Sequence, residues 1–261
     1  MSAVELSEPG AERLAAELGD AIERRQLQLF YQPIVSLLDR VAREVEALPR
    51  WPRDEGEILA PGDFIEVAEK YDLLGSLETW AIETAFEQLG GWRRSNDVDI
   101  SLNISEDHVY ASDLPEEIHG SAGRHEVDPR RLTLEVSETA LVEAGEERLQ
   151  KLQTLRNVGV GLMIHDYSGA VPADQLVELP TTALKISRRV VAGIPDAPRN
   201  TEIAATALRL AGELGLRVIA NGIESPGQFA ALRDMGCEYG QGFLFSVPMP
   251  AEVLAERALP R

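Results

Sequence analysis

The chain has 261 residues, 25 of them basic and 44 acidic, which gives a formal net charge of −19 at pH 7. Its 44% hydrophobic and 26% charged residues are typical of a globular protein, and no apolar run is long enough to span a membrane. The negative charge disfavours DNA and RNA as partners, and the single cysteine, Cys237, excludes an intrachain disulfide. We therefore expect a cytoplasmic protein without membrane or nucleic-acid partners, although a local site for a small anion stays possible.

The N-terminal segment begins with a polar lead at residues 1–9 and continues as a helix rich in Ala, Leu and Glu. Its Leu14, Leu18 and Ile22 recur at every fourth position, which predicts one apolar helix face. We expect residues 1–26 to form a helical lead-in packed on a barrel domain of residues 27–261. Docking of a partner on this helix is the alternative.

Strand and helix patterns then follow one another along the chain. Ranges 27–35 and 41–48 are separated by a short polar connection and predict an antiparallel hairpin. Helical spacings begin at about Gly62 and again at 77–92. Further strands are expected at 98–104, 131–136, 158–164, 183–186, 216–220 and 240–245, and helices at 146–156, 201–214 and 226–235. The polar range 113–131 contains two glycines and predicts an embellished connection.

About eight strands, most of them separated by helices, predict an α/β fold with a mainly parallel sheet and outer helices. The length favours a closed (β/α)8 barrel, with an open doubly wound sheet as the alternative. In such a barrel the site lies at the carboxyl ends of the strands. Polar residues stand at most of these ends: Glu46, Asn103, Glu135, Glu138, His165, Asp166, Lys185, Asn221, Glu224 and Gln241. Each alone is typical of a loop or helix cap, but the set predicts a site at the barrel mouth.

Eight short motifs occur in a fixed order along the chain. They are YQPIV (31–35), VEALPRW (45–51), FIEVAE (64–69), LNIS (102–105), LEVSE (134–138), LKIS (184–187), NGIE (221–224) and MGCEYGQGFLFSVPMP (235–250). With them the chain resembles the EAL-domain family, the bacterial phosphodiesterases and receptors of cyclic di-GMP. The resemblance implies a modified (β/α)8 TIM-type barrel whose first strand is antiparallel, in agreement with the predicted hairpin.

The resemblance also implies a two-metal site, in which Mg²⁺ or Mn²⁺ activates water for attack on a phosphodiester. Glu46, Asn103 and Glu135 match first-site ligands, and all three offer oxygen atoms that suit a hard cation. The first of the family's paired aspartates is His165 here, and a neutral imidazole cannot bridge two cations as a carboxylate can. These four positions therefore resemble the remains of a metal site.

Two further positions depart from the family pattern. Ser187 replaces the aspartate of LKID, and Asn221 replaces the glutamate thought to assist the attacking water. Asn221 cannot accept a proton at neutral pH, and loss of a general base alone costs about 10²–10⁴ in rate. The loop at 168–176 also lacks the family's glycine-threonine run. We therefore expect a degenerate member with no catalytic residue and no required cofactor, in which Mg²⁺ or Mn²⁺ binding is lost or weak. A single metal on Glu46, Asn103 and Glu135 is the alternative.

Nucleotide binding can survive the loss of hydrolysis because other residues serve it. Arg50 matches a phosphate contact of the family, and a guanidinium suits phosphate in charge and geometry. Leu48 and Pro248 match positions that flank a guanine. The complete set of predicted ligand-binding residues is Gln32, Glu46, Leu48, Arg50, Asn103, Asp166, Lys185, Glu224, Gln241 and Pro248.

Each of these contacts has a structural alternative. Arg50 could lie across Trp51, and Lys185 could form an ion pair with Glu135 or Glu138. Gln32 and Gln241 could satisfy backbone groups, and His165 could be a hydrogen-bonded residue at the mouth.

Three functions are consistent with this reading. The first is an inactive, metal-independent cyclic di-GMP receptor that signals through an unidentified protein partner. The second is a protein-interaction scaffold that binds no nucleotide, and the third is a residual cyclic di-GMP phosphodiesterase.

Overall fold

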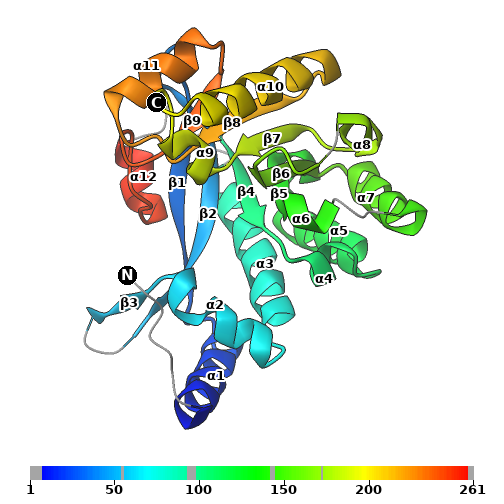
Figure 1. The fold of residues 1–261 in the computed structure, drawn as a ribbon. Helices are drawn as coiled ribbons and strands as arrows, with labels where there is room; N and C mark the ends of the chain where they lie inside the picture. The colour runs from blue at the N-terminus through cyan, green and yellow to red at the C-terminus, as the bar shows by residue number, and fades with distance from the viewer. Residues whose placement is uncertain (1–7, 54–55, 93–97, 142–144, 172, 258–261) are drawn as a thin grey trace.

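A ring of strands surrounded by helices lies at the centre of the molecule (Figure 1). The structure, a computed structural model, describes residues 8–53, 56–92, 98–141, 145–171 and 173–257. Residues 1–7 of the predicted lead-in, residue 172 of the loop at 168–176 and residues 258–261 lie outside this part. In the described chain the ring consists of β1 (Gln28–Ser36), β2 (Ala42–Pro52), β4 (Asp99–Asn103), β5 (Leu132–Ser137), β6 (Gly161–Tyr167), β7 (Ala183–Ile186), β8 (Arg217–Asn221) and β9 (Tyr239–Gln241).

The pairing of the strands closes this ring. Neighbours run in the order β1-β9-β8-β7-β6-β5-β4-β2, and β2 pairs again with β1. β1 is antiparallel to both β2 and β9, whereas the other pairs within the ring are parallel. A short β3 (Ile58–Leu59) extends the end of β2 as an antiparallel partner outside the ring. The predicted α/β barrel of modified TIM type, with its first strand antiparallel, is therefore confirmed.

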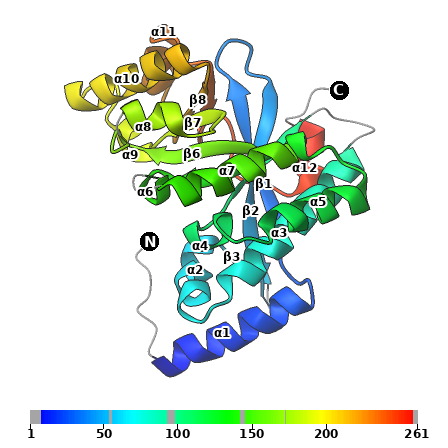
Figure 2. The same ribbon diagram turned by 90° about the vertical axis from the view of Figure 1, so that its right-hand side faces the viewer.

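Helices cover the outside of the ring (Figure 2). They are α1 (Glu8–Glu23), α2 (Pro61–Lys70), α3 (Leu74–Trp92), α4 (Glu106–Val109), α5 (Leu114–His125), α6 (Glu138–Leu141), α7 (Glu146–Val158), α8 (Ala173–Glu178), α9 (Arg188–Ala192), α10 (Pro198–Leu214), α11 (Pro226–Asp234) and α12 (Ala251–Arg257). A 3-10 turn at Pro129–Arg131 precedes β5. α1 lies against α2 and α3, with Ala11 and Ala15 packed in one cluster with Val67.

The interior of the ring changes from apolar to polar along the strands. Ile34, Met163, Ala183 and Ile219 form a buried apolar cluster inside it. Residues two apart on a strand share a face, so Lys185 points inward next to Ala183 but nearer to the carboxyl end. The same spacing relates His165 to Met163 and Asn221 to Ile219. The strands therefore place an apolar floor beneath a polar mouth.

Several predicted boundaries were wrong. The strand expected at 158–164 begins only at Gly161, because α7 continues to Val158 and ends at Gly159 in the left-handed conformation, with φ of 119°. The polar range 113–131 contains α5 as well as the 3-10 turn, so it is more than a connection. The strand expected at 240–245 stops at Gln241, because both Gly222 and Ile223 donate to the Gln241 carbonyl and the chain then turns. Among the described residues no helix is long and apolar enough to cross a membrane.

Candidate functional site

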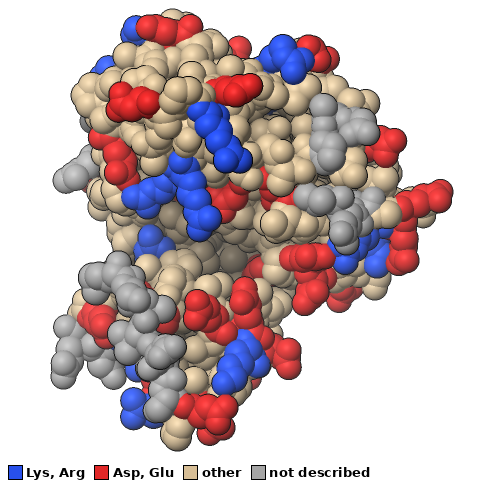
Figure 3. Space-filling model, in the orientation of Figure 1, with Lys and Arg blue, Asp and Glu red and all other residues tan. Residues whose placement is uncertain are grey.

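The carboxyl ends of the seven parallel strands, β2 and β4 to β9, meet at one end of the barrel, where the surface is hollowed. Figure 3 shows the hollow near the centre of this face, with Lys and Arg side chains gathered along one side of it. Register brings Gln32 of β1 opposite Glu46 of β2 and Asn103 of β4 opposite Glu135 of β5. Because the carboxyl ends of the parallel strands lie together at this mouth and β1 runs past them in the opposite direction, residues far apart in the sequence become neighbours.

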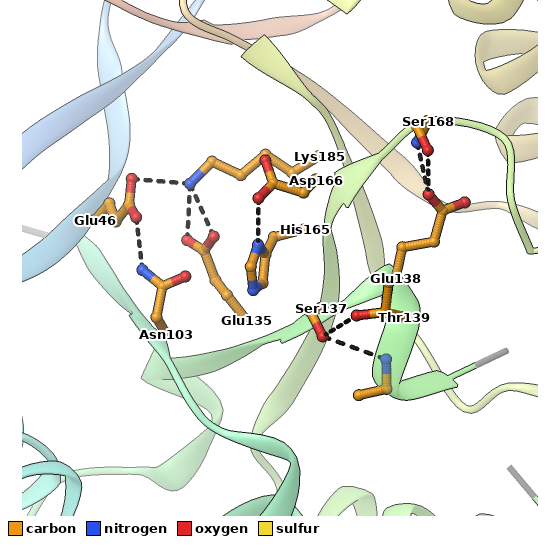
Figure 4. Close-up of polar contacts among 11 residues, drawn as sticks. Glu46, Asn103, Glu135, Ser137, Glu138, Thr139, His165, Asp166, Ser168 and Lys185 are labelled. Atoms are coloured by element: carbon orange, nitrogen blue, oxygen red, sulfur yellow. Dashed lines mark hydrogen bonds and ion pairs between the residues drawn. The ribbon is translucent and has the colours of Figure 1, made fainter. Parts of the chain in front are cut away.

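The ammonium of Lys185 on β7 is the centre of the mouth (Figure 4). Its Nζ lies 2.9 Å from Glu46 Oε2, and 3.0 and 2.8 Å from the two carboxylate oxygens of Glu135. The Lys185 side chain is 2% exposed, Glu135 1% and Glu46 11%. The alternative of an ion pair between Lys185 and Glu135 is therefore correct, Glu46 is a second partner, and Glu138 is not one.

This buried group of charges shifts the pKa of each member. Burial lowers the pKa of Lys185, but the charges of Glu135 and Glu46 outweigh burial and raise it above its ordinary value. Burial raises the pKa of Glu135, and Lys185 offsets only part of that effect. Burial also acts on Glu46, but its contacts with Lys185, Gln241 and Asn103 leave its pKa lowered. The ammonium thus keeps Glu46 ionised in a site from which water is largely excluded.

Amide side chains complete the contacts of Glu46. Asn103 Nδ2 donates to Glu46 Oε1 at 2.8 Å, and Gln241 Nε2 donates to Glu46 Oε2 at 2.7 Å. Gln241 Nε2 also donates to Gln32 Oε1 at 3.0 Å, and Gln32 Nε2 donates to the Ser246 carbonyl at 2.9 Å. In the part of the chain that the structure describes, Gln32 donates to a backbone carbonyl and Gln241 does not, so the backbone alternative is correct for Gln32 alone of the two glutamines. Within the described residues the buried Oε1 of Gln241 has no hydrogen-bond partner.

His165 and Asp166 stand at the end of β6, beside this group. His165 Nδ1 lies 3.6 Å from Asp166 Oδ2, and the Asp166 side chain is 65% exposed. The nearby His165 ring holds the pKa of Asp166 below its ordinary value. Asp166 has a φ of 56°, and the pairing of β6 with β7 shifts register between Ile164 and Tyr167. His165 thus stands beside a carboxylate at the mouth, but at 3.6 Å this contact is too long for the hydrogen bond that the structural alternative expected.

The residues present at the mouth fit an ammonium ion better than a divalent metal ion. Glu46 and Glu135, two of the predicted vestigial ligands, direct their oxygens at Lys185 Nζ. A divalent cation between these carboxylates would lie next to a buried positive charge and would have to displace it. In the described chain no three His, Cys, Asp or Glu side chains are arranged to hold a metal ion. No reaction step is therefore assigned to a metal here.

The remaining predicted ligand residues lie around the rim rather than in this group. Arg50 Nη1 donates to the Pro49 carbonyl at 2.8 Å, and its guanidinium lies 5.7 Å from the ring centre of Phe30, not across Trp51. Burial lowers the pKa of Arg50, with Glu46 and Asp63 acting in the opposite direction. Glu224 accepts from Arg188 at 2.5 Å. Leu48 lines a neighbouring cavity, and Pro248 lies two residues after Ser246, whose carbonyl accepts from Gln32.

A cavity of about 430 Å³ opens beside the mouth, between the ends of β2 and β4 and helices α2 and α3. Its wall is mainly apolar and includes Leu48, Pro61 and Ile65, while Asn103 and His165 stand on the side of the mouth. Such a lining suits a flat ring with a few polar edges.

An ionic group supports the wall of this cavity. Glu78 of α3, which lines the cavity, lies 2.9 Å from His108 Nδ1, and Glu117 of α5 lies 3.4 Å from His108 Nε2. Burial lowers the pKa of His108, but the hydrogen bonds and charges of Glu117 and Glu78 outweigh it and raise the pKa to about 9. His108 is therefore a charged link between α4 and its two neighbours.

Glu138 has a role that sequence reasoning missed. Its Oε2 accepts from the backbone N–H of Ser168 at 2.7 Å and from the Ser168 hydroxyl at 2.8 Å. Its Oε1 accepts from the N–H groups of Ala170 and Val171 at 2.7 and 2.9 Å. One buried carboxylate thus holds the loop after β6 in place (Figure 4). Its position after LEVS was the one available signal, and this predicted only a polar strand end.

The chain matches proteins of one family over most of its length. A model of the EAL domain matches residues 15–248. Cyclic di-GMP phosphodiesterase NbdA of Pseudomonas aeruginosa is 33% identical over 247 residues, which cover 94% of this chain and 32% of that protein. Oxygen sensor protein DosP of Escherichia coli is 33% identical over 242 residues, covering 92% of this chain and 30% of that protein. The chain therefore spans about a third of the length of these curated relatives.

A solved structure extends the comparison to the fold. The PaMucR phosphodiesterase in complex with c-di-GMP superposes on this chain with a TM-score of 0.88 and is 32% identical. The match covers 93% of this chain and 99% of that one.

Proposed function

The chain belongs to the EAL domain family, and we propose that its barrel mouth binds cyclic di-GMP without a metal ion and without hydrolysing it. The observation that carries this proposal is that the ammonium of Lys185 stays buried between Glu46 and Glu135 while Ser187 and Asn221 stand where the family pattern has carboxylates. This ammonium neutralises part of the charge that a metal ion would otherwise have to offset before an anionic ligand could approach.

The side chains at the mouth support binding of a phosphate-containing ligand. Arg50 is half-buried, so its guanidinium has lost part of its hydration, and a phosphate oxygen would restore those contacts. A guanine ring would enter the cavity beside Leu48, with its polar edge toward Asn103. Repulsion from the net charge of −19 is screened beyond about 8 Å at physiological salt, so the local groups dominate.

Three other residues at the mouth argue against hydrolysis. Attack on a phosphodiester requires a group that accepts a proton from water, and Asn221 at the end of β8 has no such group. Ser187 caps α9 by accepting from the Val190 N–H at 3.3 Å, so its oxygen already has a structural contact. His165 is paired with Asp166. Bound nucleotide is therefore retained intact, and its occupancy is passed to a protein partner.

The test is titration calorimetry with cyclic di-GMP in EDTA and again in Mg²⁺, with chromatography of the mixture afterwards. We expect saturable binding in both buffers and intact nucleotide. Arg50→Ala should weaken binding at least about tenfold, since a charge-assisted hydrogen bond contributes about 1.5–3 kcal/mol. The exposed Arg43, which pairs with Asp39, provides the matched control Arg43→Ala. Release of linear dinucleotide would point to the residual phosphodiesterase, and no heat in either buffer would point to the scaffold.

A further inference from the structure

We infer that Arg189 forms a second anion site at the barrel mouth, which binds the phosphate group of the ligand that Arg50 does not reach. The inference rests on the proposed function and assigns a residue to one half of the ligand. The site is a cavity of about 640 Å³ at the ends of β6 and β7. It is lined by Asp166, Ser168, Ser187, Arg188, Arg189, Val190, Ala192 and Asn200.

The backbone that carries Arg189 is held on both sides. The Ser187 hydroxyl accepts from the Val190 N–H at 3.3 Å at the start of α9. Asn200 Nδ2 donates to the Arg189 and Val190 carbonyls at 2.9 and 2.8 Å. A side chain at Gly193 would not permit this clamp, because its Cβ would lie 2.5 Å from Asn200 Cγ. The short helix is thus fixed from α10, and Arg189 starts from a defined position in the cavity wall.

The charges around the cavity leave Arg189 as the cation that can receive an anion. Arg188 is engaged, since it donates to Glu224 at 2.5 Å and lies 5.8 Å from the ring centre of Phe243. Asp166, which also lines the cavity, lies 3.6 Å from His165 Nδ1 and is 65% exposed. In the described chain no carboxylate lies within 4.0 Å of the Arg189 guanidinium, although Arg189 and Asp166 sense each other's charge. No acceptor among the residues that the structure describes is hydrogen-bonded to the Arg189 guanidinium, and an exposed guanidinium of this kind is suited to bidentate contact with phosphate.

Arg189 and Arg50 lie on different sides of the barrel mouth, as the two phosphates of a cyclic dinucleotide would require. Arg50 lies on β2, whereas Ser187 and Arg189 follow β7, and three strands, β4, β5 and β6, lie between β2 and β7 on that side of the ring. The two guanidinium groups therefore stand on roughly opposite sides of the mouth, with Lys185 buried between them. A cyclic dinucleotide carries its two phosphates on opposite sides of one ring, so Arg50 and Arg189 would each receive one.

The experiment compares cyclic di-GMP binding in EDTA by the whole chain and four variants. They are Arg189→Ala, Arg189→Lys, the double variant with Arg50→Ala, and the control Arg209→Ala. Arg209 is an exposed arginine of α10 that pairs with Glu213. We expect Arg189→Ala to weaken binding about tenfold and Arg189→Lys to restore part of the loss, because a charge-assisted contact is removed and then partly replaced. The losses from Arg50→Ala and Arg189→Ala should multiply in the double variant, since the two groups contact different phosphates.

The outcomes separate this inference from the proposed function. If the wild type binds and Arg189→Ala binds as tightly as Arg209→Ala, the second anion site is wrong and the proposed function stands. If the wild type does not bind, the proposed function is wrong and the inference falls with it. Thermal unfolding of each variant shows whether the fold is retained, and Arg189→Lys tests the site even if the alanine variant is unstable.

Discussion

Replacement of Lys185 by Met removes the positive charge from the barrel mouth and keeps much of the side-chain volume. Glu46 retains hydrogen bonds from Asn103 and Gln241, but within the described residues Glu135 retains only the one that Ser101 donates to its Oε1 at 2.6 Å. Removing one partner from a buried ion pair costs about 3–5 kcal/mol, because the other charge stays buried and unpaired. We expect Lys185→Met to lower the free energy of unfolding by this amount near neutral pH.

The loss should depend on pH in a defined direction. Glu135 already has a raised pKa in the wild type, and loss of the ammonium raises it further. A carboxyl whose folded pKa is raised contributes stability at low pH and loses it as pH rises from its unfolded value, about 4.3, through the folded value. The variant should therefore be closer to the wild type at about pH 5 than at about pH 8.

Urea unfolding at these two pH values measures the effect. The double variant Lys185→Met/Glu135→Gln should recover most of the loss, because the amide keeps the contact with Ser101 and carries no charge. Lys151→Met is the matched control, since Lys151 forms an exposed pair with Glu147 and its loss should cost less than about 1 kcal/mol. If Lys185→Met unfolds within about 1 kcal/mol of the wild type at the higher pH, the ammonium does not neutralise a buried carboxylate.

Three further outcomes are expected. Glu138→Gln should lower the free energy of unfolding by about 1–3 kcal/mol, because Glu138 accepts hydrogen bonds from the backbone of the loop after β6. Proteases should then cleave within 168–171 faster, and an unchanged cleavage rate would contradict the role of Glu138 in holding that loop. The raised pKa of His108, about 9, contributes stability that is complete below about pH 6.5 and is lost as pH rises toward 9. The free energy of unfolding in urea should therefore fall with pH over this range in the wild type and not in His108→Gln. An equal dependence on pH in both proteins would exclude the ionic link. Excess Mn²⁺ should raise the midpoint of thermal unfolding of Lys185→Met more than that of the wild type, and equal shifts would show that the ammonium does not block a metal.

The barrel was predictable from the sequence because its strands follow a simple order. The hairpin of β1 and β2 and the alternation after it gave the correct closed sheet with an antiparallel first strand. α5 was missed because Gly120, Gly123 and Pro115 are typical of a connection. Pro115, however, lies in the first turn of the helix, where a proline costs no hydrogen bond, and Gly123 has open space around it. α4, α6, α8, α9 and α12, none longer than seven residues, are too short to show a helical period.

The site was predictable as a set of strand ends but not as a network. The sequence placed Glu46, Glu135 and Lys185 at one end of the barrel. It left open which carboxylate receives the lysine, because Lys185 and Glu46 are 139 positions apart and their contact depends on the closure of the ring. The role of Glu138 could not be predicted either, because its partners are mainly backbone N–H groups, which every residue type except proline carries.

β1 pairs with its two neighbours in the ring over very different lengths. Eight register positions join β1 to β2, whereas two, Val35 with Gly240 and Ser36 with Tyr239, join it to β9, with Tyr31 held separately by Met249. Amide hydrogens along this seam should thus exchange with solvent earlier than those of the inner strands. Gln241 on β9 reaches across the seam to Gln32 and Glu46, so a molecule bound over these three side chains would slow the opening of the barrel itself. A ligand bound at the mouth would then slow amide hydrogen exchange at the opposite end of β1, without a change in the average structure there.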